Sequence, residues 1–589
     1  MAGEKRRSSY RPRLWILAAV AVVLALGLGL GLGLGLKHRH HNAVSNPPST
    51  EALPFLNPQT SSNFVVGSIV GQSPQDRNYN FTVALANGAP DGVNKTMLVV
   101  NGMYPGPTIE VNQGDRLIVK VQNNLPNTTS IHWHGLFQNG TNWYDGTSGI
   151  TECGIPPGQS LTYNFTLGEF SGTTWYQCRQ IVSTQYTDGV TGALIVHPTQ
   201  NTSALPAYDS EIVIQMADLY HDQSQVLLTE YLSPEGIQGQ QGNEPVPDGG
   251  TINGLGQYSA AGTGGSYFDY TVQRNKTYRL RLVNSGSFPA IRFSVDDHPL
   301  TLIEADGTLL APTQVSGVIV AVAQRYSVLL YANQTSVQNG TFWMRATLQS
   351  DMFLYEQPGQ NVDIRGVIRY GAKTGVPGDT ASADPGPGVS DLVDVNGTTA
   401  LVPLEPSPAP NVTRAAPVTI SFQTTPDGQF LGFMNDTSWE PLNGTSTLLA
   451  VHQNPTGFAP DGVGLGAGDQ LLVTADSIQV VDLRVDNLDD GDHPFHLHGH
   501  RPWIMGSGGG RYIGQELNAT SPLRRDTILI PAYSWVVLRF VTDNPGLWAF
   551  HCHIAWHMAA GLLMQISSQL SALSSLTVPP DIVTQCQRR

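Results

Sequence analysis

The chain of 589 residues is too long for one ordinary domain, and its length is typical of three or four domains. Charged residues make up only 13% of it, whereas 62 glycines and 40 prolines favour a β-rich protein with many turns over a helical one. The formal net charge of −15 argues against a nucleic-acid partner, because nucleic acids are bound by basic surfaces.

The first 36 residues predict a membrane anchor. Residues 1–13 form a basic tail, and the run from Leu14 to Leu36 carries no charged side chain. At about 1.5 Å per residue, a helix of this length can cross a bilayer core of about 30 Å. More basic residues precede the run than follow it, so we expect a single-pass type II membrane protein with a lumenal or extracellular ectodomain. Cleavage of a signal peptide, followed by secretion, is the alternative.

Fourteen Asn-x-Ser/Thr sequons occur, all after the apolar run. Any one of them could arise by chance, but so many are hard to reconcile with a cytosolic protein. They predict an exported glycoprotein.

The rest of the chain predicts three β-sandwiches. Residues 37–60 form a polar stalk, after which short β-branched and aromatic runs alternate with Gly, Asn and Pro turns. Such runs, without long helical periods between them, favour an all-β fold of sandwiches over βαβ units. The expected domains are 61–200, 205–370 and 416–570, with a Pro/Gly-rich linker at 371–415 and a C-terminal tail at 571–589.

Three histidine clusters indicate metal binding. They read HWHG from His132, HPFHLHGH from His493 and HCHIAWHMAAGL from His551. Because residues i and i+2 of a strand point to the same side, each His-x-His pair presents two imidazoles together. A cysteine inside one of these pairs, Cys552, then points the opposite way. One strand thus offers a thiolate to one metal site and two imidazoles to another.

Two more imidazoles beside Cys552 would complete a trigonal His₂Cys blue-copper site, and His493 and His557 are the candidates. Zinc is the weaker alternative, since structural zinc sites favour compact Cys/His spacings within short loops.

These motifs resemble three of the four copper signatures of multicopper oxidases. PLRRDTILIPAYSWVVLRF, DNPGLWAFHCH and YPGPTIEVNQGD resemble fungal, in particular ascomycete, laccases and laccase-like oxidases, and the resemblance spans about residues 61–570. It implies three cupredoxin domains with four copper ions in or between the first and third. It assigns a type 1 copper to His493, Cys552 and His557, with Leu562 in the axial position, and a type 2 copper to His132 and His496. It assigns a type 3 pair of copper ions to two pairs of histidines, His134 with His553 and His498 with His551.

The resemblance also implies further roles. Cys153 and Cys586 resemble a family disulfide that joins the C-terminal tail to the first domain, and Asp145 resembles a carboxylate that delivers protons to bound oxygen, with a turn residue as the alternative. Glu244 and Asp248 fall where related oxidases place an acid beside the type 1 copper, which could accept a phenol proton or bind Fe²⁺.

The fourth signature is altered. The resemblance predicts a His-x-His pair after Gly-Thr-x-Trp-Tyr, but Gln177 and Arg179 occupy those places, with Cys178 between them. Arginine is always protonated and has only donors, so it cannot bind copper, and strand alternation aims Cys178 away. Three explanations are open: an error in the gene model such as a misplaced intron boundary, a true variant with an impaired trinuclear cluster, or altered ligation that still reduces O₂.

The resemblance therefore implies a laccase-type oxidase. A phenol or diphenol would give single electrons to the type 1 copper, and Cys552, His551 and His553 would pass them to a trinuclear cluster that reduces O₂ to water. The alternatives are a ferroxidase and a copper-binding protein with impaired or no oxidase activity.

Overall fold

Short strands rich in Val, Ile and Leu form six sheets in the part of the chain that the structure describes. The computed structural model describes residues 53–179, 184–199, 205–258, 264–334, 340–372, 374–378, 401–454 and 462–587, which belong to the unit Leu53–Arg589. Strand content is 43% and helix content 9%, which confirms the predicted all-β class.

Domain 1 contains two four-stranded sheets. Along β5, exposed or half-buried residues alternate with buried ones, as expected for a strand with one face on a core. The two sheets have the orders β3 (Lys95–Val100), β2 (Asp76–Gly88), β5 (Arg116–Asn123), β7 (Ser160–Thr166) and β4 (Ile109–Asn112), β9 (Thr191–His197), β8 (Gly172–Gln177), β6 (His132–Trp133).

Domain 2 contains a seven-stranded and a five-stranded sheet. The larger sheet consists of β1 (Val65–Val66), β10 (Ser210–Leu219), β13 (Thr277–Asn284), β18 (Arg325–Tyr331), β15 (Leu300–Ala305) and β16 (Thr308–Val315), with β11 (Gly249–Ile252) on β10. The smaller one has the order β12 (Phe268–Val272), β20 (Asp363–Tyr370), β19 (Thr341–Leu348), β14 (Ile291–Val295), β17 (Val318–Val320).

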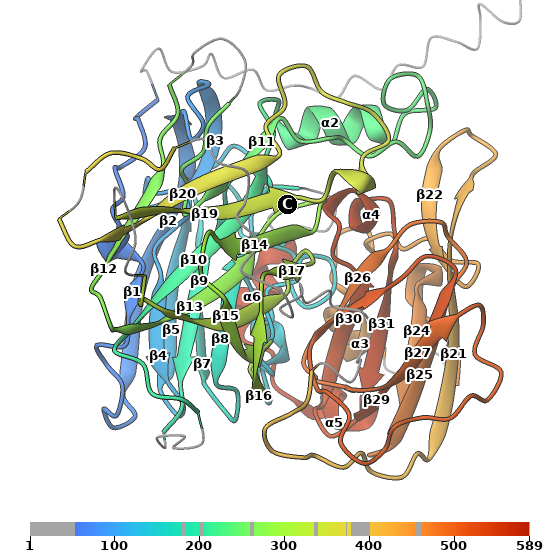
Figure 1. Ribbon diagram of the computed structural model, residues 1–589. Coiled ribbons are helices and arrows are strands. Elements are labelled where there is room, and N and C mark those ends of the chain that lie inside the picture. Colours follow the sequence, from blue (N-terminus) through green and yellow to red (C-terminus); the bar gives the residue numbers. More distant parts are fainter. Residues whose placement is uncertain are drawn as a thin grey trace, which may run out of the picture. The chain divides into compact units, whose positions relative to one another are not determined.

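Domain 3 contains a five-stranded and a six-stranded sheet and is drawn in orange and red in Figure 1. The first has the order β22 (Phe430–Met434), β21 (Arg414–Thr424), β25 (Val480–Asn487), β29 (Ser534–Val541), β27 (Trp503–Gly509). The second has the order β23 (Gly462–Leu465), β24 (Leu471–Ala475), β31 (Leu563–Ser568), β30 (Gly546–Cys552), β26 (His493–Leu497), β28 (Thr527–Ile530).

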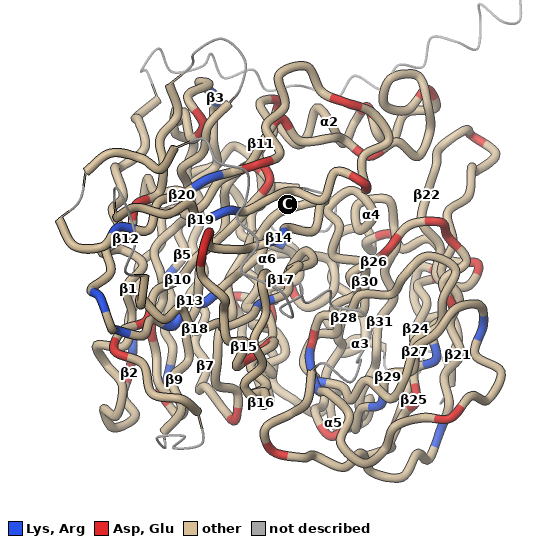
Figure 2. The backbone as a smooth tube through the Cα atoms, viewed as in Figure 1, with Lys and Arg blue, Asp and Glu red and all other residues tan. Residues whose placement is uncertain are grey.

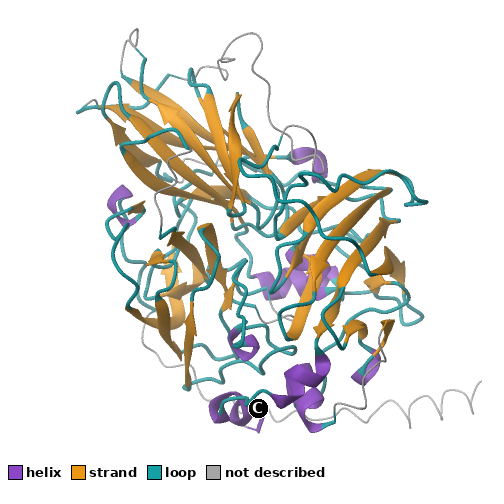
Figure 3. Ribbon diagram, turned by 90° about the horizontal axis from the view of Figure 1, so that it is seen from below, coloured by secondary structure: helices purple, strands orange, loops and turns teal. Residues whose placement is uncertain are grey.

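Helices are short, and strands make up most of the regular structure (Figure 3). The α-helices are α2 (Ser224–Tyr231), α3 (Thr447–Gln453), α4 (Ala555–Ala559), α5 (Leu570–Ser575) and α6 (Pro580–Gln587). The 3-10 turns are η1 (Ser61–Asn63), η2 (Asn142–Tyr144), η3 (Ser350–Met352) and η5 (Ala467–Asp469).

Two predicted boundaries differ from the observed elements. Strand β1 lies within predicted domain 1 (61–200), yet it pairs antiparallel with β10 of domain 2. Strand β21 begins at Arg414, inside the predicted linker 371–415, because its Arg414 already pairs with Val481 of β25. Both differences arise from long-range strand pairing, which local composition does not encode.

A disulfide joins Cys153 to Cys586, as predicted, across 433 residues of sequence. The bond places α6 on domain 1, where Ile582 is fully buried in the core of that domain. Loop-closure entropy makes a bond over so long a loop stabilising.

No helix among the described residues is both long enough and apolar enough to cross a membrane. The predicted basic tail (1–13) and anchor (14–36) lie outside the described residues, as does the stalk (37–60) up to Ala52.

Candidate metal centres

Strand β30 carries two of the predicted copper ligands, His551 and Cys552. It ends in His551 and Cys552 and lies between β26 and β31, with His496 of β26 opposite His551. Because successive side chains alternate, Cys552 packs in the apolar core of domain 3, whereas His551 points toward Arg179 of domain 1.

Cys552, His493 and His557 converge on one point. The Sγ atom of Cys552 lies 3.7 Å from Nδ1 of His493 and 3.6 Å from Nδ1 of His557, and these two nitrogens lie 3.2 Å apart. Helix α4 carries His557, one turn after the strand ends. All three side chains are buried. This trigonal set of one sulfur and two imidazole nitrogens fits a blue-copper ion, and we call it the type 1 site.

Electrostatics favour a metal at the type 1 site. Burial acts to raise the pKa of the Cys552 thiol, but hydrogen bonds with His493 and His557 outweigh it and lower the pKa to about 7. The thiolate that copper requires is therefore accessible near neutral pH. Leu562 is fully buried, and its carbonyl accepts the Cys552 N–H at 3.1 Å, so the residue beside the sulfur offers no side-chain ligand.

A carboxylate holds each type 1 imidazole from its outer side. Nε2 of His557 donates to Glu244 Oε1 at 2.8 Å, and Nε2 of His493 donates to Asp489 Oδ2 at 3.1 Å. This leaves both Nδ1 lone pairs for a metal. Sequence reasoning proposed Glu244 but missed Asp489, whose place four residues before His493 was the available signal.

Both carboxylates face a cavity of about 490 Å³. Acidic segments gather around α2, α4 and β22 in Figure 2, and the acids that line the cavity are Glu244, Asp351, Asp489, Asp490 and Asp492. Asp248, predicted as the alternative acid, does not line it. Asp248 Oδ2 accepts the backbone N–H of His221 at 2.8 Å instead.

A second group of imidazoles forms where domains 1 and 3 meet. His132 and His134 come from β6 and the turn after it, and His496 from β26. A ligand nitrogen from each ring lies within 4.8 Å of those of the other two. In each ring one buried nitrogen has no hydrogen-bond partner among the described residues, namely Nε2 of His132, Nδ1 of His134 and Nε2 of His496. A metal ion fits such lone pairs.

The remaining predicted copper ligands, His498, His551 and His553, have ring nitrogens that contact one another or other protein side chains. Nε2 of His498 lies 3.3 Å from Nε2 of His551, which Nη2 of Arg179 also contacts. The side-chain amide of Gln177 donates to His553 Nε2 at 2.9 Å. The nitrogens that the resemblance assigns to a type 3 copper pair thus face an amide and a guanidinium, and this half of the site does not fit two copper ions.

Asp145 contacts the candidate ligands rather than serving only in a turn. His498 Nδ1 donates to its Oδ2 at 2.9 Å, and Oδ1 lies 3.5 Å from His132 Nδ1. Burial would raise the pKa of Asp145, but the two histidines hold it well below its usual range. Asp145 is therefore an anion that orients two imidazoles.

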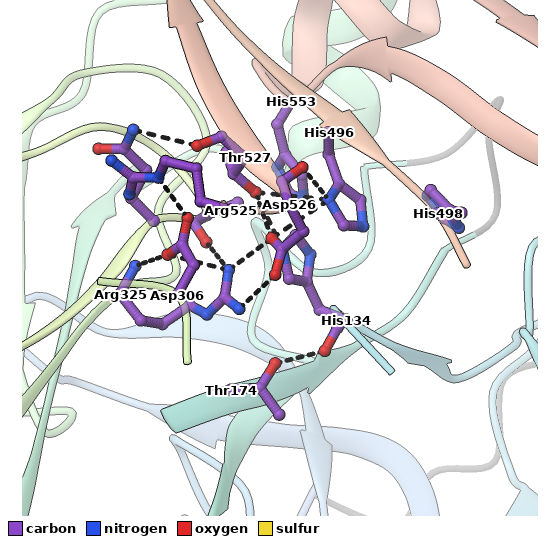
Figure 4. Close-up of polar contacts among 12 residues, drawn as sticks. His134, Thr174, Asp306, Arg325, His496, His498, Arg525, Asp526, Thr527 and His553 are labelled. Atoms are coloured by element: carbon purple, nitrogen blue, oxygen red, sulfur yellow. Dashed lines mark hydrogen bonds and ion pairs between the residues drawn. The ribbon is translucent and has the colours of Figure 1, made fainter. Parts of the chain in front are cut away.

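Asp526 connects the site to all three domains, and sequence reasoning missed it (Figure 4). His134 Nε2 donates to its Oδ1 at 3.0 Å, and Arg325 of domain 2 donates to both of its oxygens at 2.7 and 2.6 Å. The sequence feature that could have indicated Asp526 is its position directly before β28, within the segment PLRRDTILIPAYSWVVLRF. Asp526 therefore orients a ligand and joins the domains.

Cys178 points away from the metal centres, as strand alternation predicts. It is buried in the core of domain 1, and its Sγ lies 3.0 Å from Gln185 Oε1.

Comparisons with known proteins agree with this geometry. Residues 82–201, 210–373 and 441–570 match three family models, each described as multicopper oxidase. The chain is 34% identical over 544 residues to Laccase-1 of Cryptococcus neoformans var. grubii, covering 87% of this chain and 83% of the relative. It is 32% identical over 530 residues to the iron transport multicopper oxidase fetC of Epichloe festucae, covering 87% and 79%.

The fold is similar to that of Fet3p, described as a multicopper oxidase that functions in iron import. The TM-score is 0.77 at 27% identity, over 87% of this chain and 95% of that one. The two-sheet sandwiches are therefore cupredoxin-like domains, as the motifs implied. With its His₂Cys site and these matches along its length, the chain belongs to the multicopper oxidase family, and it is a copper-dependent oxidoreductase.

Proposed function

We propose that the protein is a laccase-type oxidase, which removes single electrons from phenols or diphenols at the type 1 site. The observation that carries this proposal is one imidazole, His557. Its Nδ1 faces Cys552 Sγ and its Nε2 faces Glu244, at the wall of the cavity of about 490 Å³. Copper bound there would exchange single electrons with a substrate in that cavity.

The residues around His557 suit a phenol. Phe422 and Phe430 line the cavity and stack at 5.4 Å between ring centroids, and Phe422 also packs edge-on against His557 at 4.8 Å. These rings offer an aromatic surface. A phenol loses a proton as it loses an electron, and Glu244 is placed to accept that proton.

Electrons can leave the type 1 site along β30. His551 and His553 flank Cys552 in sequence, so a path of a few covalent bonds runs from the sulfur to either imidazole. Dioxygen is the acceptor that multicopper oxidases use. Its reduction to water needs a complete set of ligands beyond these two histidines, and Gln177 and Arg179 depart from that set.

A ferroxidase is the second candidate, and one observation favours it. Carboxylates hold both type 1 imidazoles, and three further acids line the same cavity. Hard cations such as Fe²⁺ take oxygen ligands of this kind. The similarity to iron transport oxidases supports the same reading.

Glu244→Gln separates the two candidates. If the substrate is a phenol, we expect kcat/KM for a diphenol to fall about tenfold or more, because proton acceptance is lost. Copper content and blue colour should stay unchanged. Steady-state rates with a diphenol and with Fe²⁺ are the measurement, and Asp248→Asn, an acid-to-amide change outside the cavity, is the matched control. Loss of Fe²⁺ oxidation with unchanged diphenol oxidation would favour the ferroxidase instead.

We further propose that the reaction takes place outside the cytosol, on a glycosylated ectodomain held by the apolar run Leu14–Leu36. Eleven of the fourteen sequon asparagines fall among the described residues, and none of the eleven is buried. Protein from a eukaryotic host should therefore lose mass on treatment with an endoglycosidase and should sediment with membranes. Unglycosylated protein in the cytosolic fraction would refute this, and glycosylated protein in the medium would favour a cleaved signal peptide.

A further inference from the structure

Three imidazoles at the boundary of domains 1 and 3 are arranged as ligands of a single ion. Each has one ring nitrogen with no partner among the described residues, although the rings are buried. His134 and His496 stack with centroids 3.7 Å apart, and His132 lies 5.8 Å from His496. Buried polar atoms are otherwise paired in folded proteins, so three such atoms side by side point to a missing partner.

The opposite nitrogen of each ring is fixed by an oxygen. His132 Nδ1 donates to the Asp145 carbonyl at 2.7 Å, and His496 Nδ1 donates to the Asp526 carbonyl at 2.9 Å. His134 Nε2 donates to the Asp526 carboxylate at 3.0 Å. Metal-binding histidines show this arrangement, because the outer hydrogen bond sets the tautomer that aims a lone pair at the ion.

At the neighbouring His551 and His553, the Nε2 atoms have partners from the protein instead. Nη2 of Arg179 contacts Nε2 of His551 and lies 3.4 Å from Met558 Sδ, while Nη1 lies 3.4 Å from Nε2 of His553. Gln177 donates to the same His553 nitrogen at 2.9 Å. The guanidinium of Arg179 thus fills the space beside His551 and His553 with N–H donors, which cannot bind a cation, and the amide N–H of Gln177 occupies the same nitrogen of His553.

Arg179 also places a fixed positive charge there. Its side chain is 1% exposed, and the contacts of its guanidinium within the described part of the chain are with His551, His553 and Met558 rather than with a carboxylate. A copper ion beside this guanidinium would meet like charge in a buried environment, which disfavours binding.

We propose that this chain replaces the trinuclear cluster by a mononuclear copper site of His132, His134 and His496. Arg179 takes the place of the type 3 ion that His498 and His551 would bind. Gln177 donates to His553, which is assigned to the other type 3 ion together with His134. The protein then holds two copper ions, one at the type 1 site and one at the three-histidine site. The inference rests on the type 1 copper of the proposed function and concerns its acceptor side: two copper ions still allow electrons to be taken from a substrate at the type 1 site, but they do not form the trinuclear cluster that would reduce O₂ to water.

Metal analysis of the full chain tests this. The protein is expressed from a sequenced cDNA, loaded with copper and freed of excess metal. We expect about two copper ions per chain, one with the electron paramagnetic resonance signal of blue copper and one with a non-blue signal. About four ions, with a spin-coupled pair, would overturn the inference, and so would a transcript that encodes His-x-His at 177 and 179.

Variants assign the second ion. His132→Ala should lose the non-blue signal and keep the blue one, and loss of the blue signal alone would overturn the assignment. A chain that never turns blue refutes the type 1 site, and hence the proposed function, while its non-blue signal still reports on the three-histidine site.

A gain of metal tests the role of the two altered positions. The double variant Gln177→His with Arg179→His should bring the total to about four ions, whereas the matched control Arg179→Lys, which keeps the charge, should stay at about two. A double variant that remains at two ions would show that these side chains do not exclude the type 3 pair.

Discussion

Replacing Cys552 with serine is expected to abolish the blue colour of the copper-loaded protein and to lower diphenol oxidation by about a thousandfold or more. The colour comes from a copper–thiolate bond, and Cys552 is the one cysteine that lies within 4 Å of two imidazole nitrogens among the described residues. Serine is nearly isosteric, so the sandwich should still fold. Visible absorption and steady-state rates are the measurements.

Cys178→Ser is the matched control for that variant. Cys178 is also buried and is not disulfide-bonded, but it lies in the core of domain 1. The Cys178→Ser protein should stay blue and active. A blue Cys552→Ser protein, or a colourless Cys178→Ser protein, would contradict the type 1 assignment.

Replacing Asp526 with alanine is expected to destabilise the protein by about 3–5 kcal/mol, because it leaves buried positive charge without its partner. Arg325 binds both oxygens of Asp526, and Asp306 alone would then face Arg325 and Arg525 (Figure 4). All four side chains are at most 1% exposed, so water cannot replace the lost partner. Urea unfolding of the copper-free protein at pH 7 measures the change.

The pH dependence of the same variant gives an independent check. Burial acts to raise the pKa of Asp526, but Arg325 and the hydrogen bonds from His134 and His496 hold it well below its usual range. A depressed carboxyl pKa stabilises the folded state above the ordinary value of about 4 and loses that contribution as the pH falls toward the folded-state pKa. The difference between wild type and Asp526→Ala should therefore shrink in acid.

An exposed ion pair supplies the control for Asp526. Asp209 pairs with Lys276 at the surface, and Asp209→Asn should change the unfolding midpoint little. Equal loss of stability in the two variants would show that the buried cluster does not join the domains in the way described.

The sequence was sufficient to predict what short-range periodicity encodes. Strand alternation predicted that Cys552 and His551 face different ways, and β30 shows it. The same rule predicted that His134 would lie beside His132 and His498 beside His496; both second residues lie just past a strand end, and the ring centroids are 5.9 and 4.6 Å apart. The Cys153–Cys586 bond came from the resemblance, because a pairing across 433 residues leaves no local pattern.

The rest depends on contacts between distant segments. Asp526 reaches His134 across 392 positions, and nothing near either residue announces the contact. Glu244 and Asp248 looked equivalent in sequence, yet the loop fold turns one toward His557 and the other toward His221. Gln177 and Arg179 were expected in the ligand places and lie there, but their contacts with His551 and His553 required the structure.

Anaerobic mixing of the copper-loaded protein with a diphenol shows directly whether a sulfur-ligated copper accepts electrons from the substrate cavity. We expect a blue protein whose colour bleaches as the diphenol is oxidised, at a rate that Glu244→Gln lowers. A protein that is loaded with copper but colourless, or whose blue colour persists in the presence of excess diphenol, would contradict this expectation.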